Sequence, residues 1–424
     1  QHPHHIPLLF MADVIHGCRT IAPIPLGQAC SFHPELVSEA ASIAASEASS
    51  EGLRATFSPM IDVSRDPRWG RMMESFGEDP YVNGIMGKAM VDGYQQKADT
   101  GIAACLKHFA GYGAVNAGRE YNDVEISQRT FLEQYVKPFR MALKAKPAMV
   151  MTAFNAIDRK PISGNKELLK GLLRDKEGFE GTVISDWGSI GQLEEQGVAA
   201  DMEEAAIQAS EAGVDIDMMS PAYMLCLEKL VESGKIPEAF VDESAFRVLM
   251  MKNQLGLFEN PFAGLGKSGK LTLHSREKAY QLAGESCVLL KNEKKILPLS
   301  VKKKVIWAGP YTASREFLSR WSIFGEHESV ETIEEVLQKK QIEAECITGC
   351  NILSDEECKV WQVEQELSDK PRDEQWLETI THEDTVVCVL GEHESQSGEA
   401  ASRAFLTLPE EQQMLFEKIA ERTR

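Results

Sequence analysis

The chain has 424 residues, of which 43% are hydrophobic and 26% are charged, and its formal net charge is −20. This length predicts two or three domains, and the composition is typical of a globular protein. The negative charge disfavours a nucleic-acid partner, because binding a phosphate backbone requires clustered lysine and arginine. No apolar run reaches the roughly 18 residues of a membrane-spanning helix, so we predict no membrane partner. A neutral ligand such as a sugar is compatible with this charge.

Short apolar runs alternate with amphipathic segments from the start of the chain. The predicted strands are residues 6–13, 54–62, 102–109, 148–155, 181–187 and 213–218. The predicted helices are residues 34–51, 80–97, 128–145, 165–175, 200–211 and 222–233. This alternation predicts a parallel sheet with helices outside it, and runs that are apolar throughout are typical of strands buried on both faces.

Polar residues follow nearly every predicted strand: Asp13, Asp62, Lys107, His108, Asn155, Asp186 and Asp217. The carboxyl ends of the strands carry the chemistry in a (β/α)8 barrel, and ligands bind at the same ends of an open doubly wound sheet. A dinucleotide-binding sheet needs a glycine fingerprint after its first strand, and this sequence has none, so the barrel is favoured. Six βα units are predicted where a closed barrel has eight, so we expect a TIM-type barrel that is incomplete on its N-terminal side.

Residues 256–273 are rich in glycine and proline and lack periodicity, which predicts a linker. The strands predicted beyond it are residues 288–291, 304–308, 343–347 and 385–390. The helices predicted there are residues 275–286, 329–339, 355–380 and 409–422. We therefore expect a barrel domain over residues 1–255 and a second α/β domain, ending incomplete, over residues 274–424.

The nine cysteines are irregularly spaced. The only close set is Cys346, Cys350 and Cys358, and the lack of a CxxC pair disfavours a metal cluster there. Others, such as Cys105 and Cys388, lie in apolar runs and are expected to be buried small side chains in a reducing compartment. This pattern predicts a cytoplasmic location.

Asp186 ends an apolar strand, where a carboxylate gains nothing from packing. It is either a functional residue or the N-cap of a short helix beginning at Trp187, and its position alone does not decide between them. Lys107 and His108 are adjacent ionisable residues in another buried run, which is costly unless both meet partners. A polyhydroxyl ligand would accept hydrogen bonds from both.

Three further residues are expected at the same rim. The carboxylate of Asp13 is suited to two vicinal hydroxyls of a sugar. Arg119 lies in a glycine-rich loop after the Lys-His strand. Arg71 shares the segment 64–71 with two other arginines, and we expect two of these three to fix the loop by pairing with nearby carboxylates rather than to bind ligand.

A polar loop over residues 391–403 holds three glutamates, Glu392, Glu394 and Glu399. A long polar loop after a strand is either a solvated surface loop or a segment that serves a neighbouring site.

Taken together, these segments resemble the family-three glycoside hydrolases, specifically the multidomain bacterial β-glucosidases. The matching blocks are MADVIHG (11–17), DPRWGR (66–71) with ESFGEDP (74–80), KHF (107–109) with GREYN (118–122), MTAFN (151–155), SDW (185–187) and SGEAASR (397–403). They occur in the family's order and cover almost the whole chain. The resemblance implies a (β/α)8-like barrel followed by an α/β sandwich. Family members extend beyond both ends of this sequence, so we expect an internal fragment.

The resemblance also implies a role for each matching residue. Asp186 is similar to the catalytic nucleophile, and Glu399 to the acid/base that the second domain supplies, with Glu392 and Glu394 as alternatives because the loop varies. The residues that match the sugar-holding set are Asp13, Arg71, Lys107, His108 and Arg119, with Met151 and Trp187 as walls. No metal or organic cofactor is implied.

The implied activity is that of a retaining, exo-acting β-glucosidase that releases the nonreducing-end glucosyl residue of a β-linked gluco-oligosaccharide, as a monomer or homodimer. A β-xylosidase of the same family is an alternative. A Schiff-base lyase acting through Lys107 and an inactive sugar-binding fragment are alternatives of other classes. An N-acetylglucosaminidase is disfavoured, because the loop over residues 110–119 lacks the Asp-His signature of those relatives.

Overall fold

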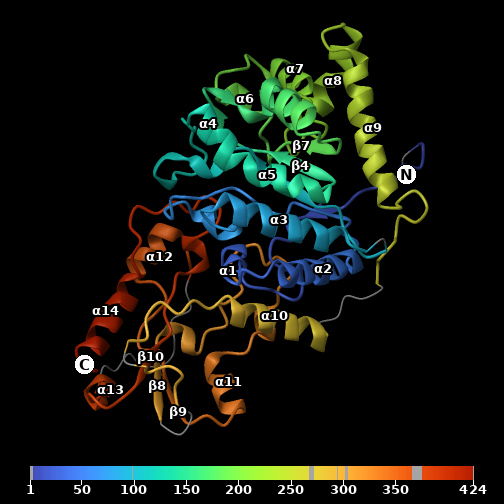
Figure 1. The fold of residues 1–424 in the computed structure, drawn as a ribbon. Helices are drawn as coiled ribbons and strands as arrows, with labels where there is room; N and C mark the ends of the chain where they lie inside the picture. The colour runs from blue at the N-terminus through green and yellow to red at the C-terminus, as the bar shows by residue number, and fades with distance from the viewer. Residues whose placement is uncertain are drawn as a thin grey trace. The chain divides into compact units, whose positions relative to one another are not determined.

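The structure is a computed structural model that describes residues 3–97, 99–266, 272–293, 295–300, 304–364 and 375–423. The chain divides into two compact units. The first unit comprises Gln1–Cys287 together with Trp321–Phe324, and the second comprises Val288–Arg320 and Gly325–Arg424. Figure 1 traces the chain from blue at the N-terminus to red at the C-terminus.

The first unit is built on parallel strands at the predicted positions. Strand β1 pairs with β2, while β3, β4 and β7 form a sheet in that order. Isolated parallel bridges join Ala55 to Ala103, Met60 to Lys107 and Ile184 to Ile216, so every predicted strand segment of this unit takes part. The regular strands are shorter than predicted: β1 (Met11–Ala12), β2 (Ala55–Thr56), β3 (Cys105–Phe109), β4 (Met149–Thr152) and β7 (Thr182–Ile184).

Side chains along these strands alternate between two apolar clusters. Cys105 and Met149 belong to a small cluster made almost wholly of strand residues. Their neighbours Leu106 and Val150 belong to the larger cluster that the strands share with the helices. Because successive side chains of a strand point to opposite faces, the strands are buried on both sides, as predicted. This arrangement is that of a barrel-type α/β domain with its polar groups at the strand ends.

Helices follow the strands close to their predicted limits: α2 (Pro34–Ser50), α3 (Pro80–Gln95), α7 (Met202–Ala212) and α8 (Ala222–Glu232). Two of them begin at an acidic N-cap. Asp79 accepts hydrogen bonds from the backbone of Tyr81 and Val82, and Asp201 accepts one from Glu204. The segment predicted as one helix over 128–145 is instead divided into α4 (Gln128–Thr130), the π-helical η4 (Phe131–Tyr135) and α5 (Lys137–Ala142).

Helix α9 (Glu238–Gln254) was not predicted from the sequence. Of its residues only Met251 is buried, although Phe240 and Phe246 are also apolar. A helix whose apolar residues do not gather on one buried face lacks the periodicity on which sequence prediction depends.

The second unit contains a three-stranded parallel sheet in the order β10–β8–β9. Its strands are β8 (Val305–Ala308), β9 (Ala344–Ile347) and β10 (Val386–Cys388), and its helices include α11 (Ile333–Lys339), α12 (Asp355–Trp361), α13 (Gln375–Thr379) and α14 (Glu410–Ala420). The single helix predicted over 355–380 is represented by α12 and α13, and residues 365–374 lie outside the described part. The prediction of an α/β domain is confirmed.

Two expectations near the boundary differ from the structure. The strand predicted over residues 288–291 is not formed, and Leu290 there is 91% exposed. Helix α10 (Leu273–Glu285), expected in the second domain, belongs to the first unit, where it packs against α2 through an ion pair between Lys278 and Glu39. Of the predicted linker, residues 267–271 lie outside the described part.

Candidate active site

The carboxyl ends of the first unit's strands bring together charged residues that are far apart in the sequence. Lys107 Nζ lies 2.9 Å from Asp13 Oδ1, and Lys107 is 3% exposed. Burial lowers the pKa of Lys107, but the carboxylates of Asp13 and Glu74 outweigh burial and leave that pKa raised. The amine is therefore held as an ammonium group. Both residues were predicted for the site, and the structure shows that they are partners.

Arg71 forms a second buried pair, with Glu74. Its Nε and Nη2 atoms lie 2.9 and 3.1 Å from the two carboxylate oxygens, a bidentate arrangement. The same Nη2 atom lies 3.2 Å from His108 Nε2. Pairing with Glu74 was expected as a loop-fixing alternative for an arginine of this segment. Arg71 fixes the loop by this pairing and also contacts His108 at the strand ends. Arg68 of the same segment pairs with Asp66.

His108 lies between two carboxylates. Its Nδ1 atom is 2.8 Å from Asp62 Oδ2, and its Nε2 atom is 3.4 Å from Asp186 Oδ2. Burial, with further contributions from Arg71 and Lys107, lowers the pKa of His108 well below its ordinary value. The ring is therefore neutral at physiological pH. Burial also raises the pKa of Asp62 to about 8.

Asp186 follows β7 and is 6% exposed. Its Oδ1 atom accepts a hydrogen bond of 2.7 Å from the backbone of Trp187. Residues 187–191 form turns, and the next helix, α6 (Gln192–Glu195), begins after Gly191. The alternative of a helix N-cap is therefore wrong, and Asp186 lies beside His108 at the rim.

Three predicted site residues are not joined to this cluster by the contacts above. Arg119 is exposed, and its Nε atom donates to the carbonyl of Asn116. Trp187 is 62% exposed next to Asp186. Met151 is buried in the strand cluster. The role of Arg119 as a sugar contact, and those of Met151 and Trp187 as walls of the sugar site, stay predictions.

Glu399 lies in the second unit and is half-buried. Its backbone carbonyl accepts a 3.2 Å hydrogen bond from Arg320. Glu392 and Glu394 are exposed, and Glu392 pairs with Arg403. The loop is anchored rather than merely solvated, since it is tied to the rest of its unit through Arg320.

Sequence reasoning noted Asp62 at a strand end but did not assign it to the site, and it missed Tyr112 and Glu120. Glu120 Oε2 accepts a 2.8 Å hydrogen bond from Trp69 Nε1, and its other oxygen accepts from the hydroxyl of Tyr112. The Tyr112 ring packs edge-on against His108 at 5.2 Å between centroids. Glu120 is the neighbour of Arg119 in the GREYN block, so this loop is fixed to the wall of the site.

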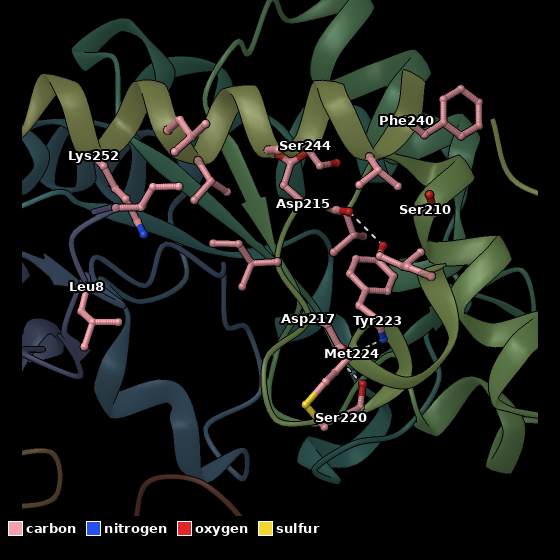
Figure 2. Close-up of a pocket in the computed structure, with 18 of the residues that line it drawn as sticks. Leu8, Ser210, Asp215, Asp217, Ser220, Tyr223, Met224, Phe240, Ser244 and Lys252 are labelled. Carbon is pink, nitrogen blue, oxygen red and sulfur yellow. Dashed lines mark hydrogen bonds between the residues drawn. The ribbon is translucent and has the colours of Figure 1, made fainter. Parts of the chain in front are cut away.

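An apolar groove of about 620 Å³ lies elsewhere in the first unit, beside the segment around Ile216 (Figure 2). Residues 6–8, α8 and α9 line it. Asp215 at its wall is paired with Arg174 and Arg247 at 2.7 and 2.8 Å. Of the polar residues predicted at the strand ends, Asp217 alone lines this groove, and none of the residues assigned to catalysis or sugar binding does, so the chemistry is expected at the other strand ends.

Two family models match the chain. Residues 1–251 match the glycosyl hydrolase family 3 N-terminal domain, and residues 287–424 match the glycosyl hydrolase family 3 C-terminal domain. The chain belongs to glycosyl hydrolase family 3. The family's architecture, a TIM barrel followed by an α/β sandwich, confirms the predicted fold class.

The similar proteins are glycosidases of this family. The periplasmic beta-glucosidase of Salmonella typhimurium is 38% identical over 97% of this chain and 56% of its own length. A beta-xylosidase of Formosa agariphila is 30% identical over 98% of this chain and 60% of its own. The crystal structure of a beta-glucosidase from Listeria innocua in complex with glucose superposes with a TM-score of 0.92 at 41% identity, covering 99% of this chain and 57% of that one.

The chain thus spans little more than half the length of these family 3 relatives. None of the described helices combines the length and the apolar character that a membrane crossing requires. The cytoplasmic location stays a prediction, since one relative is named as periplasmic. Among the described residues, no group of three or more His, Cys, Asp or Glu side chains is arranged to hold a metal ion.

Replacing Asp62 with Asn should change how stability depends on pH. The pKa of Asp62 rises from 3.8 to about 8 on folding, so between these values the folded chain binds a proton that the unfolded chain has lost. This contribution favours folding at low pH and is lost as the pH rises through about 8. We expect the free energy of unfolding of Asp62→Asn, relative to the unchanged chain, to increase with pH by up to about 1.4 kcal/mol per unit. Urea unfolding from about pH 5 to pH 8 measures this.

Asp66→Asn is the matched control. The hydrogen bond from Arg68 holds the pKa of Asp66 below its ordinary value, so this carboxylate is ionised in both states over the same range. Its stability difference should stay flat. A flat difference for Asp62→Asn as well would contradict the prediction.

Proposed function

We propose that this chain forms the catalytic part of a retaining, exo-acting β-glucosidase. The observation that carries the proposal is the buried carboxylate of Asp186, placed at the strand ends beside His108 and within a cluster that includes Arg71, Lys107 and Asp13. Vicinal hydroxyls of a sugar match such a set of donors and acceptors. The relatives named as β-glucosidases, one crystallised with glucose, support the same assignment.

The proposed reaction has two steps. An oxygen of Asp186 attacks the anomeric carbon, the bond from that carbon to the leaving oxygen breaks, and the leaving oxygen takes the proton of Glu399. A water molecule then attacks the anomeric carbon, Glu399 takes a proton from this water, and the ester bond to Asp186 breaks. A retaining enzyme requires the two carboxyl groups to lie about 5–5.5 Å apart when the site is assembled. The product sugar keeps its β configuration.

The remaining residues are proposed to hold the nonreducing-end sugar. Asp13 and Lys107, which already form an ion pair, would accept from and donate to neighbouring hydroxyls. Neutral His108 and the Arg71 guanidinium would bind further hydroxyls of the same sugar. Because these side chains are fixed by one another before ligand binds, little conformational entropy is lost on binding.

A Schiff-base lyase is disfavoured by the same geometry. A lysine that attacks a carbonyl must be unprotonated, which calls for a lowered pKa. The pKa of Lys107 is raised, because Asp13 and Glu74 outweigh burial.

The substrate class is tested by turnover of 4-nitrophenyl β-glucoside and β-xyloside. We expect a kcat/KM for the glucoside at least about 10-fold higher, because the hydroxymethyl group that xylose lacks adds contacts in a fitted site. A preference for the xyloside would favour the β-xylosidase alternative, which a relative of that name supports. Turnover of neither by a folded chain would favour the sugar-binding alternative.

The nucleophile is tested by trapping with a 2-fluoro-β-glucoside. Mass spectrometry should find one sugar on a peptide that contains Asp186, because the fluorine slows the second step more than attack with a good leaving group. Asp186→Asn should form no adduct and should lose at least about 10³-fold in kcat. Asp217→Asn is the matched control: Asp217 also follows a strand segment but bonds to Ser220 and Tyr223, so that variant should still be labelled. An adduct on another residue would remove Asp186 from this role.

The acid/base is tested by chemical rescue. Glu399→Ala should turn over 2,4-dinitrophenyl β-glucoside slowly, and azide should restore the rate and give the β-glucosyl azide, since azide attacks without a general base. Glu392→Ala and Glu394→Ala serve as controls and should show no azide effect. Rescue of one of these controls instead would move the assignment to that residue.

A further inference from the structure

Asp62 is a buried carboxylate outside the predicted sugar-holding set. It is 2% exposed, and its Oδ2 atom accepts two hydrogen bonds of 2.8 Å from His108, one from the backbone N–H and one at Nδ1. Within the part of the chain that the structure describes, Oδ1 has no hydrogen-bond partner. A buried oxygen without a hydrogen-bond partner is energetically costly, which calls for an explanation. We look for it in the effect of Asp62 on His108.

The neighbouring arginine decides where the proton on His108 lies. Arg71 Nη2 lies 3.2 Å from His108 Nε2, and a guanidinium group has donors but no acceptor. Nε2 must therefore accept, and a neutral imidazole then carries its proton on Nδ1. That proton points to Asp62 Oδ2, which accepts it whether or not Oδ1 is protonated.

The other charged groups around the ring are consistent with this arrangement. Lys107 is adjacent on β3, Glu74 holds the far side of Arg71, and Asp186 Oδ2 is 3.4 Å from Nε2. Two cations near a buried ring oppose a second proton on it. The competing arrangement, in which Nε2 carries the proton and donates to Asp186, would place a donor against the Arg71 donor.

We propose that Asp62 is a positioning residue that holds His108 in the tautomer protonated at Nδ1, so that Nε2 faces the proposed sugar site as a hydrogen-bond acceptor. The assignment of a ligand to Nε2 rests on the proposed function, whereas the tautomer does not. Outer carboxylates that fix a histidine in this way are common where the second ring nitrogen does the binding. A sugar hydroxyl that donates to Nε2 would take the place of the Arg71 N–H there, because this nitrogen has a single lone pair.

The tautomer can be read directly by long-range ¹H–¹⁵N correlation spectra of the imidazole rings in the full chain. Only ten histidines contribute, and the His108 signals are those that vanish in His108→Gln. We expect the Nδ1-protonated pattern in the unchanged chain and its loss or averaging in Asp62→Ala. Asp62→Asn should keep it, because the backbone N–H of His108 forces the amide oxygen, not the amide nitrogen, to face the ring.

A His108 ring protonated at Nε2 in the unchanged chain would overturn the proposal, and so would an Asp62→Ala chain that keeps the Nδ1 pattern. If Asp62→Ala does not fold, the unchanged chain and Asp62→Asn decide the outcome. Turnover of 4-nitrophenyl β-glucoside gives a second readout, with kcat/KM roughly 10- to 100-fold lower in Asp62→Ala and less affected in Asp62→Asn. If the chain shows the expected tautomer but turns over no substrate, the proposed function is contradicted and the tautomer assignment is not.

Discussion

Burial of charge at the strand ends is the constraint on which the rest of the site depends. Lys107 and Arg71 are 3% and 2% exposed, so neither keeps the water that solvates such groups at a surface. Each is stable there only because a carboxylate meets it: Asp13 for Lys107 and Glu74 for Arg71. Removing one partner of a buried pair typically costs about 3–5 kcal/mol. The energetic requirement for pairing therefore also fixes the positions of the groups before a ligand is bound.

The fold places this cluster at the carboxyl ends of the strands. The strands are apolar on both faces along most of their length, and the ionisable side chains of this cluster, including Lys107 and His108 of β3, gather toward their carboxyl ends. Because the strands are parallel, those ends lie on the same rim. Asp13 and Lys107 are 94 positions apart in the sequence and still meet at 2.9 Å, because the segment 54–62 pairs with the strands of both.

Features that depend on local sequence pattern could be predicted from the sequence, whereas features that depend on contacts between distant residues could not. The strand segments of the first unit and the residues Asp13, Lys107 and Asp186 stand out because each breaks an apolar run. Helix α9 was missed because it has no single buried stripe. The strand predicted over residues 288–291 was wrong, because this segment pairs with no strand among the described residues. The partnership of Asp62 with His108 exists only across two strand segments, and no single-sequence signal reports it.

Two buried aspartates of the first unit, Asp215 and Asp62, differ in their ion-pair and hydrogen-bond partners. The difference indicates which one supports the fold and which one acts on the site. Asp215 meets two guanidinium groups and the backbone N–H of Val183, so its charge is neutralised and it joins β7 to the next strand segment. Among the described residues, Asp62 accepts hydrogen bonds from the ring and backbone of His108 alone, and its pKa rises because burial outweighs these bonds and the charges of Arg71 and Lys107. A carboxylate that is only partly satisfied is poorly explained as a support for the fold. It is better explained by the direction that it imposes on the imidazole, which is the group that faces the rim.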